Sequence, residues 1–201
     1  KKSSCKTLGS VVRFKYEIGR MNFDLTIIEN NSNEIKYPKR RKVMGRFDVL
    51  IIGGGVVGSA IARELTRYQL RIGVLEKNLD VCYETSGRNS GVVHGGFAYD
   101  VGTLKAKLCV EGNQGMDELS RELGFVFKRC GKVLVGKTPE DLETLKRTIA
   151  QGEKNGATKL RLLNKEELHE LVPTAVGEFA MFSENSGIVD PFNYTIALAE
   201  N

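Results

Sequence analysis

Three glycines and one carboxylate have the types and spacing needed to hold a dinucleotide. Gly53, Gly55 and Gly58 form the pattern G-x-G-x-x-G, and Glu76 follows eighteen residues after the last of them. In such a turn the first glycine lets the chain reverse, the second admits a pyrophosphate, and the third lets a helix pack on a strand. A carboxylate at this distance accepts hydrogen bonds from the adenosine ribose and would repel the 2′-phosphate of NADP.

The elements around these residues have the order that the motif requires. Residues 47–52 (F-D-V-L-I-I) are a short apolar run, which predicts a strand buried on both faces. Apolar residues at helical spacing from Val57 to Tyr68 predict a helix, and residues 71–75 predict a second strand that ends at Glu76. A pyrophosphate would then meet the positive end of a helix. Position alone does not choose between NAD and FAD. The plainer alternative, a turn used only for packing, leaves Glu76 unexplained.

The next segment, residues 77–103, is long, polar and rich in glycine. A connection of this length without regular structure usually has a function. Its Ser, Gly and Asn residues favour turns and backbone nests that hold anions or flat rings. Residues 103–123 then predict a helix whose apolar stripe consists of Leu104, Leu108, Gly112, Gly115, Leu119 and Leu123. Because glycine destabilises a helix, we expect another backbone or the cofactor to pack closely there, or else a kink or break near Gly112.

Beyond Gly124 the pattern changes to short strands mixed with helices. The sequence predicts strands at residues 125–128, 132–135, 160–163, 179–182 and 187–189. It predicts helices that begin after Thr138, Asn164 and Asp190. A mixture of this kind is typical of an α+β domain, which we interpret as part of a substrate domain.

The net charge of +5 does not describe the globular part of the chain. Residues 1–43 hold 11 Lys and Arg against 4 Asp and Glu, a net charge of +7, and residues 44–201 have a net charge of −2. We therefore expect no nucleic-acid partner. No apolar run is long enough to span a membrane. The cysteines have no metal-ligand spacing, which predicts no metal site and free thiols in a reducing cytoplasm.

Residues 1–43 differ in composition from the rest, and Met44 immediately precedes the first predicted strand. The pair Arg40-Arg41 has AGG-AGG among its codings, which is a bacterial ribosome-binding sequence. Our hypothesis is that translation starts at Met44 and that residues 1–43 are a leader read in frame. The alternative is a genuine basic extension that serves as a targeting or surface-binding arm. The codons for residues 40 and 41 decide between the two.

Residues 85–99 (T-S-G-R-N-S-G-V-V-H-G-G-F-A-Y), after a dinucleotide motif that ends in Glu76, resemble the D-amino-acid-oxidase-like FAD-dependent oxidoreductases. Within that family, residues 102–112 are similar to L-2-hydroxyglutarate dehydrogenases and oxidases. Residues 187–197 are similar to anaerobic glycerol-3-phosphate dehydrogenase. The resemblance covers residues 47–201 and implies an α/β fold. It would be a Rossmann-like FAD-binding domain of the glutathione-reductase type with part of an α+β substrate domain.

We expect the chain to divide into four parts. These are a leader at 1–43, an FAD-binding βαβ with its flavin loop at 44–124, a partial substrate domain at 125–189, and the start of a helix returning to the FAD domain at 190–201. The family's later elements, including the stretch that closes over the flavin, are not in this sequence. A non-catalytic nucleotide-binding fragment is therefore the alternative from another functional class.

The cofactor that the resemblance implies is FAD rather than NAD. The residues that would bind its ADP part are Gly53, Gly55, Gly58, Glu76 and Lys77. The residues of the loop that would run alongside the pyrophosphate and the flavin ring are Thr85, Ser86, Asn89, Ser90, Gly91 and Gly95.

His94 and Arg88 are the candidate catalytic residues. Oxidation of a secondary alcohol needs a hydride acceptor, which would be flavin N5, and a base for the hydroxyl proton. His94 would be that base or would hydrogen-bond the flavin or the substrate. Its alternatives are to order the glycine turn or to link covalently to the flavin. Arg88 would bind the N1 side of the flavin or the anionic group of the substrate, or would hold the loop through a salt bridge.

The implied substrate is a small anionic alcohol. Glycerol 3-phosphate is the best guess, and L-2-hydroxyglutarate is the alternative. The electrons would pass to a quinone, an iron–sulfur partner or oxygen, and peripheral membrane association is compatible with this. Lys105 and Lys107 are near enough in sequence to assist, or they are simply solvated. His169 lies on a polar helix face and is not expected to be catalytic.

Overall fold

The computed structural model describes residues 10–18, 21–29 and 47–201, the first two ranges by their backbone alone. Four residues on which interpretations of the sequence depend lie outside these ranges, namely Cys5, one of the cysteines interpreted as free thiols, and Arg40, Arg41 and Met44, on which the hypothesis of a leader rests. The chain divides into two compact units. The first comprises Lys1–Asn89 and Pro191–Asn201, and the second comprises Ser90–Asp190. The domain boundaries expected from the sequence, at residues 43, 124 and 189, stay a prediction.

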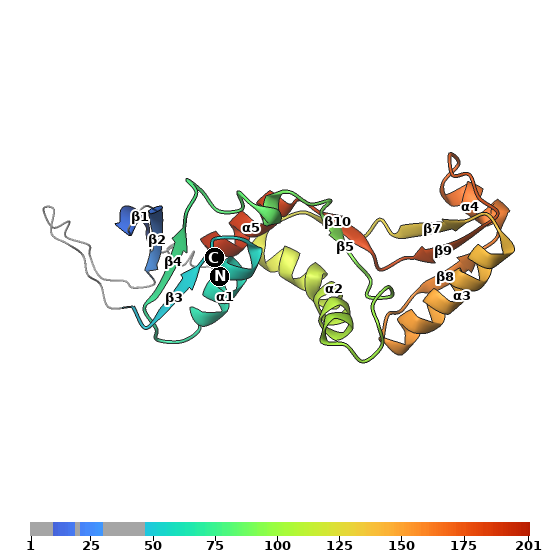
Figure 1. The fold of residues 1–201 in the computed structure, drawn as a ribbon, viewed down its shortest axis with the longest axis horizontal. Coiled ribbons are helices and arrows are strands. Elements are labelled where there is room, and N and C mark those ends of the chain that lie inside the picture. Colours follow the sequence, from blue (N-terminus) through green and yellow to red (C-terminus); the bar gives the residue numbers. More distant parts are fainter. Residues whose placement is uncertain (1–9, 19–20, 30–46) are drawn as a thin grey trace, which may run out of the picture. The chain divides into compact units, whose positions relative to one another are not determined.

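A four-stranded sheet in the order β1-β2-β4-β3 is the centre of the first unit (Figure 1). Its parallel pair, β3 (Val49–Ile52) and β4 (Ile72–Glu76), is joined by α1 (Val56–Leu65), so the expected strand–helix–strand order is present. Two antiparallel strands extend the sheet beyond β4, namely β2 (Met21–Glu29) and β1 (Ser10–Ile18). The remaining elements of the unit are the short 3-10 helix η1 (Thr85–Gly87) and α5 (Pro191–Glu200).

The core of the first unit lies between α1 and one face of the sheet. Ala62, Ile72 and Val74 are buried there, and Ile51 and Leu65 pack against them. The expectation that the first strand is buried on both faces is wrong for the described chain. β3 lies at the edge of the sheet, and on the face away from α1 the side chains of Leu50 and Ile52 are 49% and 82% exposed.

Helix α5 packs against α1, although about 130 residues separate them in sequence. Arg63 Nε donates to Asn201 Oδ1 at 2.9 Å, and the Cys82 thiol donates to the carbonyl oxygen of Pro191 at 3.5 Å. Phe192 lies against Gly87, where a Cβ would come within 2.8 Å of its ring. The last helix is thus part of the unit that contains the glycine turn.

The second unit contains two three-stranded sheets and three helices (Figure 1). The smaller sheet has the order β5-β10-β6, with bounds β5 (Val92–Val93), β10 (Gly187–Val189) and β6 (Phe127–Lys128). The larger has the order β7-β9-β8, with bounds β7 (Lys132–Gly136), β9 (Phe179–Ser183) and β8 (Leu160–Leu163). The helices are α2 (Leu104–Leu123), α3 (Pro139–Lys154) and α4 (Lys165–Leu171). Helix α3 packs along the larger sheet.

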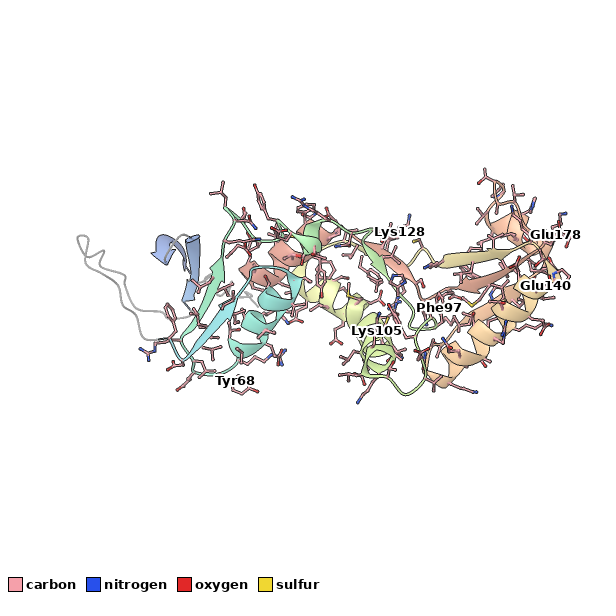
Figure 2. All side chains as sticks on the ribbon, viewed as in Figure 1. Tyr68, Phe97, Lys105, Lys128, Glu140 and Glu178 are labelled. Atoms are coloured by element: carbon pink, nitrogen blue, oxygen red, sulfur yellow. The ribbon has the colours of Figure 1, made fainter. Side chains whose placement is uncertain are left out.

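Phe97 anchors the loop after β5 in the larger core of this unit. It packs with Leu145, Ala157 and Met181, all less than 9% exposed (Figure 2). Burial of one such aromatic side chain contributes roughly 2 kcal/mol. The loop that carries His94 therefore has a fixed hydrophobic anchor three residues downstream.

The two predicted helix starts at Thr138 and Asn164 are confirmed as capping boxes. Thr138 Oγ1 accepts from the backbone N–H of Asp141, whose carboxylate accepts from the N–H of Thr138. Asn164 and Glu167 make the same reciprocal pair at α4. Hydrogen bonds from the backbone N–H groups of Lys137 and Thr138 lower the pKa of Asp141, because they stabilise its charged form.

Helix α2 corrects two expectations. It runs without a break through Gly112 and Gly115, and a Cβ on either glycine would meet no described atom within 4 Å. The break near Gly112 is therefore absent and no other described backbone packs there, and packing of the cofactor against these glycines stays a prediction. The predicted apolar stripe is also not the buried face, since Leu104 and Leu108 are exposed. The buried residues of α2 are Ala106, Val110, Asn113 and Met116.

Among the described residues no helix is both long and apolar enough to cross a membrane, and no group of His, Cys, Asp and Glu side chains is arranged to hold a metal ion. Three cysteines of the same part of the chain, Cys82, Cys109 and Cys130, are free thiols.

Candidate functional site

The glycine turn of the first unit has the geometry that its spacing predicted. Gly53 has φ +103°, a conformation that L side chains rarely adopt. A Cβ on Gly58 would overlap the carbonyl oxygen of Gly53, so only glycine lets α1 start this close to β3. Gly55 is the N-cap residue of α1 and supplies no side-chain cap. The turn therefore places no side chain of its own over the N–H groups at the start of α1.

The start of α1 is suited to an anion. Its first turn contains no acidic residue, and the peptide dipoles place a partial positive charge there. Ser86 Oγ accepts from the N–H of Val56 at 2.9 Å, and a Cβ on Gly55 would lie 2.9 Å from the same oxygen. The missing side chain of Gly55 thus makes room for Ser86, a role not foreseen from the sequence. The hydroxyl of Ser86 lies where a pyrophosphate would meet the helix.

Asn89 holds the loop that carries Ser86. Its Nδ2 donates to the carbonyl oxygens of Thr85 and Ser86 at 3.1 and 2.7 Å. Gly87 between them has no room for a side chain, because a Cβ would overlap the carbonyl oxygen of Cys82. The structure therefore brings Thr85, Ser86 and Asn89 together beside the glycine turn, as expected if they form one wall of a phosphate site.

Glu76 lies at the end of β4, directly behind the turn, and is 8% exposed. Its Oε2 accepts from the N–H of Gly54 at 2.7 Å, and its Oε1 accepts from the backbone and side-chain nitrogens of Asn78 at 2.9 and 3.0 Å. A carboxylate has about four acceptor positions. The contacts shown use three of them, which leaves capacity for a ribose hydroxyl. Glu76 thus also fixes the turn, which sequence spacing did not reveal.

Lys77 and Arg88 are less clearly aimed at a ligand. The Lys77 ammonium pairs with the Glu84 carboxylate at 2.9 Å on the surface, and this contact raises the pKa of Lys77 and lowers that of Glu84. Arg88 Nε donates to the carbonyl oxygen of Tyr83 at 3.2 Å, within its own loop. This bond accords with the loop-holding alternative for Arg88, although the acceptor is a backbone carbonyl rather than a carboxylate.

In the second unit, His94 directly follows β5, where the residue is accessible to solvent and its imidazole is partly covered by the surrounding protein. Partial burial, and secondly the Lys132 ammonium, lower the pKa of His94. Both effects disfavour the imidazolium, so the neutral form that accepts a proton is favoured near neutral pH. The environment of His94 is therefore suited to a base.

The other loop residues of this unit are placed mainly by backbone contacts. The carbonyl oxygen of Gly91 accepts from the N–H of Val189 at 2.9 Å, which ties the loop to β10, and Ser90 is exposed beside it. A Cβ on Gly95 would lie 2.8 Å from the Oγ of the buried Ser183. Gly95 therefore has a packing role in this unit, and its contact with a cofactor stays a prediction.

The two helix-surface lysines have partners within the second unit. The Lys105 Nζ lies 4.5 Å from the centroid of the Tyr99 ring (Figure 2), and Lys107 pairs with Glu111 at 3.9 Å. These contacts accord with the solvated alternative for both. His169 is exposed on α4 and serves below as a reference histidine.

Sequence patterns missed the polar groups that hold the His94 loop. Asn113 donates to the carbonyl oxygen of His94, and Asn155 donates to those of Gly96 and Tyr99. The sequence did contain an indication of the role of Asn113, because its spacing from Val110 and Met116 places it on the same helix face as these two apolar residues. The leucines on another face of the helix form a stronger apolar pattern, which led to the wrong buried face.

The family model for FAD-dependent oxidoreductases named DAO matches residues 48–201. The chain belongs to this DAO family. The family assignment confirms two expectations: the mixed α/β fold with a Rossmann-like FAD-binding part, and membership of a family of FAD-dependent oxidoreductases.

Named relatives of this DAO-family chain differ in their substrates. Glycerol 3-phosphate dehydrogenase from Caloramator mitchellensis is 42% identical over 77% of this chain and 33% of its own length. Mitochondrial L-2-hydroxyglutarate dehydrogenase from Homo sapiens is 38% identical over 77% and 34%. In a solved structure, FAD-bound L-α-glycerophosphate oxidase from Mycoplasma pneumoniae superposes with a TM-score of 0.73 at 32% identity, over 76% of this chain and 41% of that one. The chain thus spans about a third of the curated relatives' length.

The residues of the first unit fit the ADP part of FAD. Gly53 and Gly58 shape the turn, the first turn of α1 contains no acidic residue, and Glu76 retains acceptor capacity behind the turn. When bound, FAD would be held there by backbone N–H groups, with Ser86 at the pyrophosphate and Glu76 at the adenosine ribose.

Glu76→Gln is expected to weaken FAD binding by about tenfold to a hundredfold. The substitution removes a charge-assisted hydrogen bond to the ribose, worth about 1.5–3 kcal/mol, and turns an amide N–H toward groups that already donate. Titration of the apoprotein with FAD, followed by flavin fluorescence, measures the effect. Glu64→Gln, which removes an exposed carboxylate of the same unit that pairs with Arg67, is the control and should bind as the parent does. Parent-like affinity of Glu76→Gln would contradict the assignment.

Proposed function

We propose that the protein oxidises glycerol 3-phosphate. The proposal rests on the names of two relatives that were found in different ways. The relative from Caloramator mitchellensis matches by sequence, and the solved structure from Mycoplasma pneumoniae matches by fold. Both names refer to glycerol phosphate. The segment 187–197, which covers β10 and the start of α5, carried the same resemblance.

The proposed reaction gives this chain's residues three tasks. FAD, when bound, supplies the hydride acceptor for the carbinol carbon. The imidazole of His94 takes the hydroxyl proton, and its lowered pKa keeps it neutral and ready to do so. Arg88 is the candidate for the anionic group of the substrate, and Thr85, Ser86, Asn89, Ser90 and Gly91 form the loop that passes the cofactor. The electrons then leave to a quinone, an iron–sulfur partner or oxygen.

A second substrate, L-2-hydroxyglutarate, is favoured by a specific observation. Several curated relatives at 35–40% identity bear the name of its dehydrogenase, and residues 102–112 carried that resemblance. The two substrates are both anionic secondary alcohols, so the same base and acceptor would serve either. They differ in the anionic group, a phosphate or two carboxylates, which the binding residues must distinguish.

Anaerobic mixing of the FAD-loaded protein with each substrate tests the proposal. Glycerol 3-phosphate should bleach the visible absorbance of the flavin, and L-2-hydroxyglutarate should leave it unchanged. Bleaching by hydroxyglutarate alone would replace the first substrate by the second. No bleaching by either compound would contradict both.

The cellular location belongs to the same proposal. Three free thiols in the described chain support a reducing compartment, and we propose the cytoplasm. The L-2-hydroxyglutarate dehydrogenase relatives are named mitochondrial, so fractionation of the source cells is the direct measurement.

Lys132→Gln is expected to shift the acid limb of kcat/KM to higher pH. The Lys132 ammonium is the second cause, after burial, of the lowered pKa of His94. Removing its charge therefore raises that pKa, and the neutral base is lost at a higher pH as the solution is acidified. Activity should fall below the parent's on the acid side and equal it at high pH. The control is Lys137→Gln, which lies beyond the other end of β7 and should leave the acid limb of kcat/KM unchanged. An unshifted acid limb in Lys132→Gln would contradict the role of His94 or of Lys132.

A further inference from the structure

We propose that Asn113 is a positioning residue for His94, and that Arg129 fixes Asn113 in the orientation this requires. The proposal rests on the proposed function of His94 as base. All of the residues concerned lie within the second unit, so the inference depends on that unit alone.

The contact at His94 comes from two side chains on one face of α2. Asn113 Nδ2 donates to the carbonyl oxygen of His94 at 3.1 Å, and the thiol of Cys109, one helical turn earlier, donates to the same oxygen at 3.5 Å. A thiol is a weak donor, so the amide makes the stronger bond. Asn113 is 4% exposed, and loss of its partner would leave buried polar groups unsatisfied.

The guanidinium of Arg129 determines which way the Asn113 amide points. Arg129 Nη1 lies 3.0 Å from Asn113 Oδ1. A guanidinium only donates hydrogen bonds, so the amide oxygen must face it. The NH₂ group then faces two acceptors, the carbonyl oxygens of His94 and Asn185, the second at 2.9 Å. The reverse orientation would set the NH₂ group against the guanidinium and the oxygen against two carbonyls.

Arg129 is itself held by an unusually complete set of acceptors. Its Nε and Nη2 lie 2.6 Å from Asp117 Oδ2, its Nη2 donates to the carbonyl oxygen of Asn113 at 2.8 Å, and its Nη1 donates to that of Asn185 at 2.6 Å. Its carbon Cζ also lies 5.0 Å from the centroid of the Phe127 ring. This fork joins α2, β6 and the turn between β9 and β10. Lysine cannot make these bonds at once, because its ammonium is a point donor.

The backbone of His94 is thus fixed from α2, while Phe97 anchors the loop downstream. Displacement of a reacting group by about 1 Å can cost a hundredfold in rate. A bond to the carbonyl oxygen of the base's own residue is close enough to control such a displacement. Asn155 provides the comparison, since it donates to the carbonyl oxygens of Gly96 and Tyr99 in the same loop but not to that of His94.

The test compares Asn113→Asp with Asn155→Asp in the FAD-loaded protein. Asn113→Asp keeps the size and the contact with Arg129 but sets a carboxylate oxygen against the carbonyls of His94 and Asn185. We expect kcat to fall by about tenfold or more, with KM and FAD content close to the parent's. Asn155→Asp should lower thermal stability without this fall in kcat. In a His94→Gln background Asn113→Asp should cause no further loss, because its effect acts through the imidazole.

A readout that needs no turnover is labelling by diethylpyrocarbonate, located by peptide mass spectrometry with the exposed His169 as internal reference. Labelling of His94 relative to His169 should rise severalfold in Asn113→Asp and stay at the parent level in Asn155→Asp. Arg129→Lys should also raise the labelling of His94 relative to His169, but by a smaller factor. This variant keeps the test available if Asn113→Asp folds poorly. Unchanged labelling in both variants, or an equal rise in Asn155→Asp, would overturn the inference. If His94→Gln keeps parent turnover while labelling still rises in Asn113→Asp, the function of His94 fails and the positioning contact stands.

Discussion

Gly58→Ala is expected to give a protein that purifies without flavin and unfolds at a markedly lower temperature. The added Cβ would overlap the carbonyl oxygen of Gly53, and neither partner is a flexible side chain that can rotate away. Relief requires α1 to move off β3 or the turn to open. Overpacking of this kind costs about 3 kcal/mol, and an opened turn no longer presents the start of α1 to a pyrophosphate.

The same change at Gly112 is the control for stability, and its flavin content also tests whether the cofactor packs against α2. Gly112 is exposed on α2, and a Cβ there meets nothing within 4 Å. Because alanine is a better helix former than glycine, Gly112→Ala should raise stability by about 0.5–1 kcal/mol. The ratio of flavin to protein absorbance and the melting temperature measure both variants. Parent-like flavin content in Gly58→Ala would show that the turn tolerates the overlap and would remove the argument for its glycine.

His94→Gln is expected to lower kcat by about a hundredfold to ten-thousandfold, the usual contribution of a general base. Glutamine retains hydrogen-bonding capacity but accepts no proton near neutral pH. The flavin content should stay at the parent level, because the ADP-binding residues lie in the other unit. The rate of anaerobic flavin bleaching by glycerol 3-phosphate measures the step directly.

His169→Gln is the control for the loss of a histidine, since His169 is exposed on α4. Turnover close to the parent rate in His94→Gln would remove the base assignment and leave the alternative in which His94 orders the glycine turn. A covalent link would be indicated by a different result: flavin that stays attached to the parent protein after denaturation but is absent from denatured His94→Gln.

Local chemistry explains why the glycine turn was predictable. The positive φ of Gly53 and the close approach at Gly58 are properties of a few adjacent residues, so their spacing in the sequence is enough to identify them. The capping boxes at Thr138 and Asn164 were predictable for the same reason, because each is completed within four residues.

Contacts between distant segments account for what the sequence did not reveal. Leu104 and Leu108 form the stronger apolar pattern on α2, yet the helix buries Asn113, because the polar partners of Asn113 come from His94, Arg129 and Asn185. No periodicity within α2 carries that information. The two-sided burial expected for β3 failed similarly, since an apolar run indicates what a strand is able to bury and not which neighbours cover it.

The pairing of α5 with α1 bears on the order in which a ribosome lets this chain fold. Ser90–Asp190 is continuous, so the second unit can close as soon as it has emerged. The first unit needs Pro191–Asn201 as well as the residues before Ser90, and the hydrogen bond from Arg63 to Asn201 can form only once that segment is present. At about 5–20 residues per second, the glycine turn spends several seconds without its last helix during synthesis. In that interval α1 lacks the packing against α5 that it has in the folded unit.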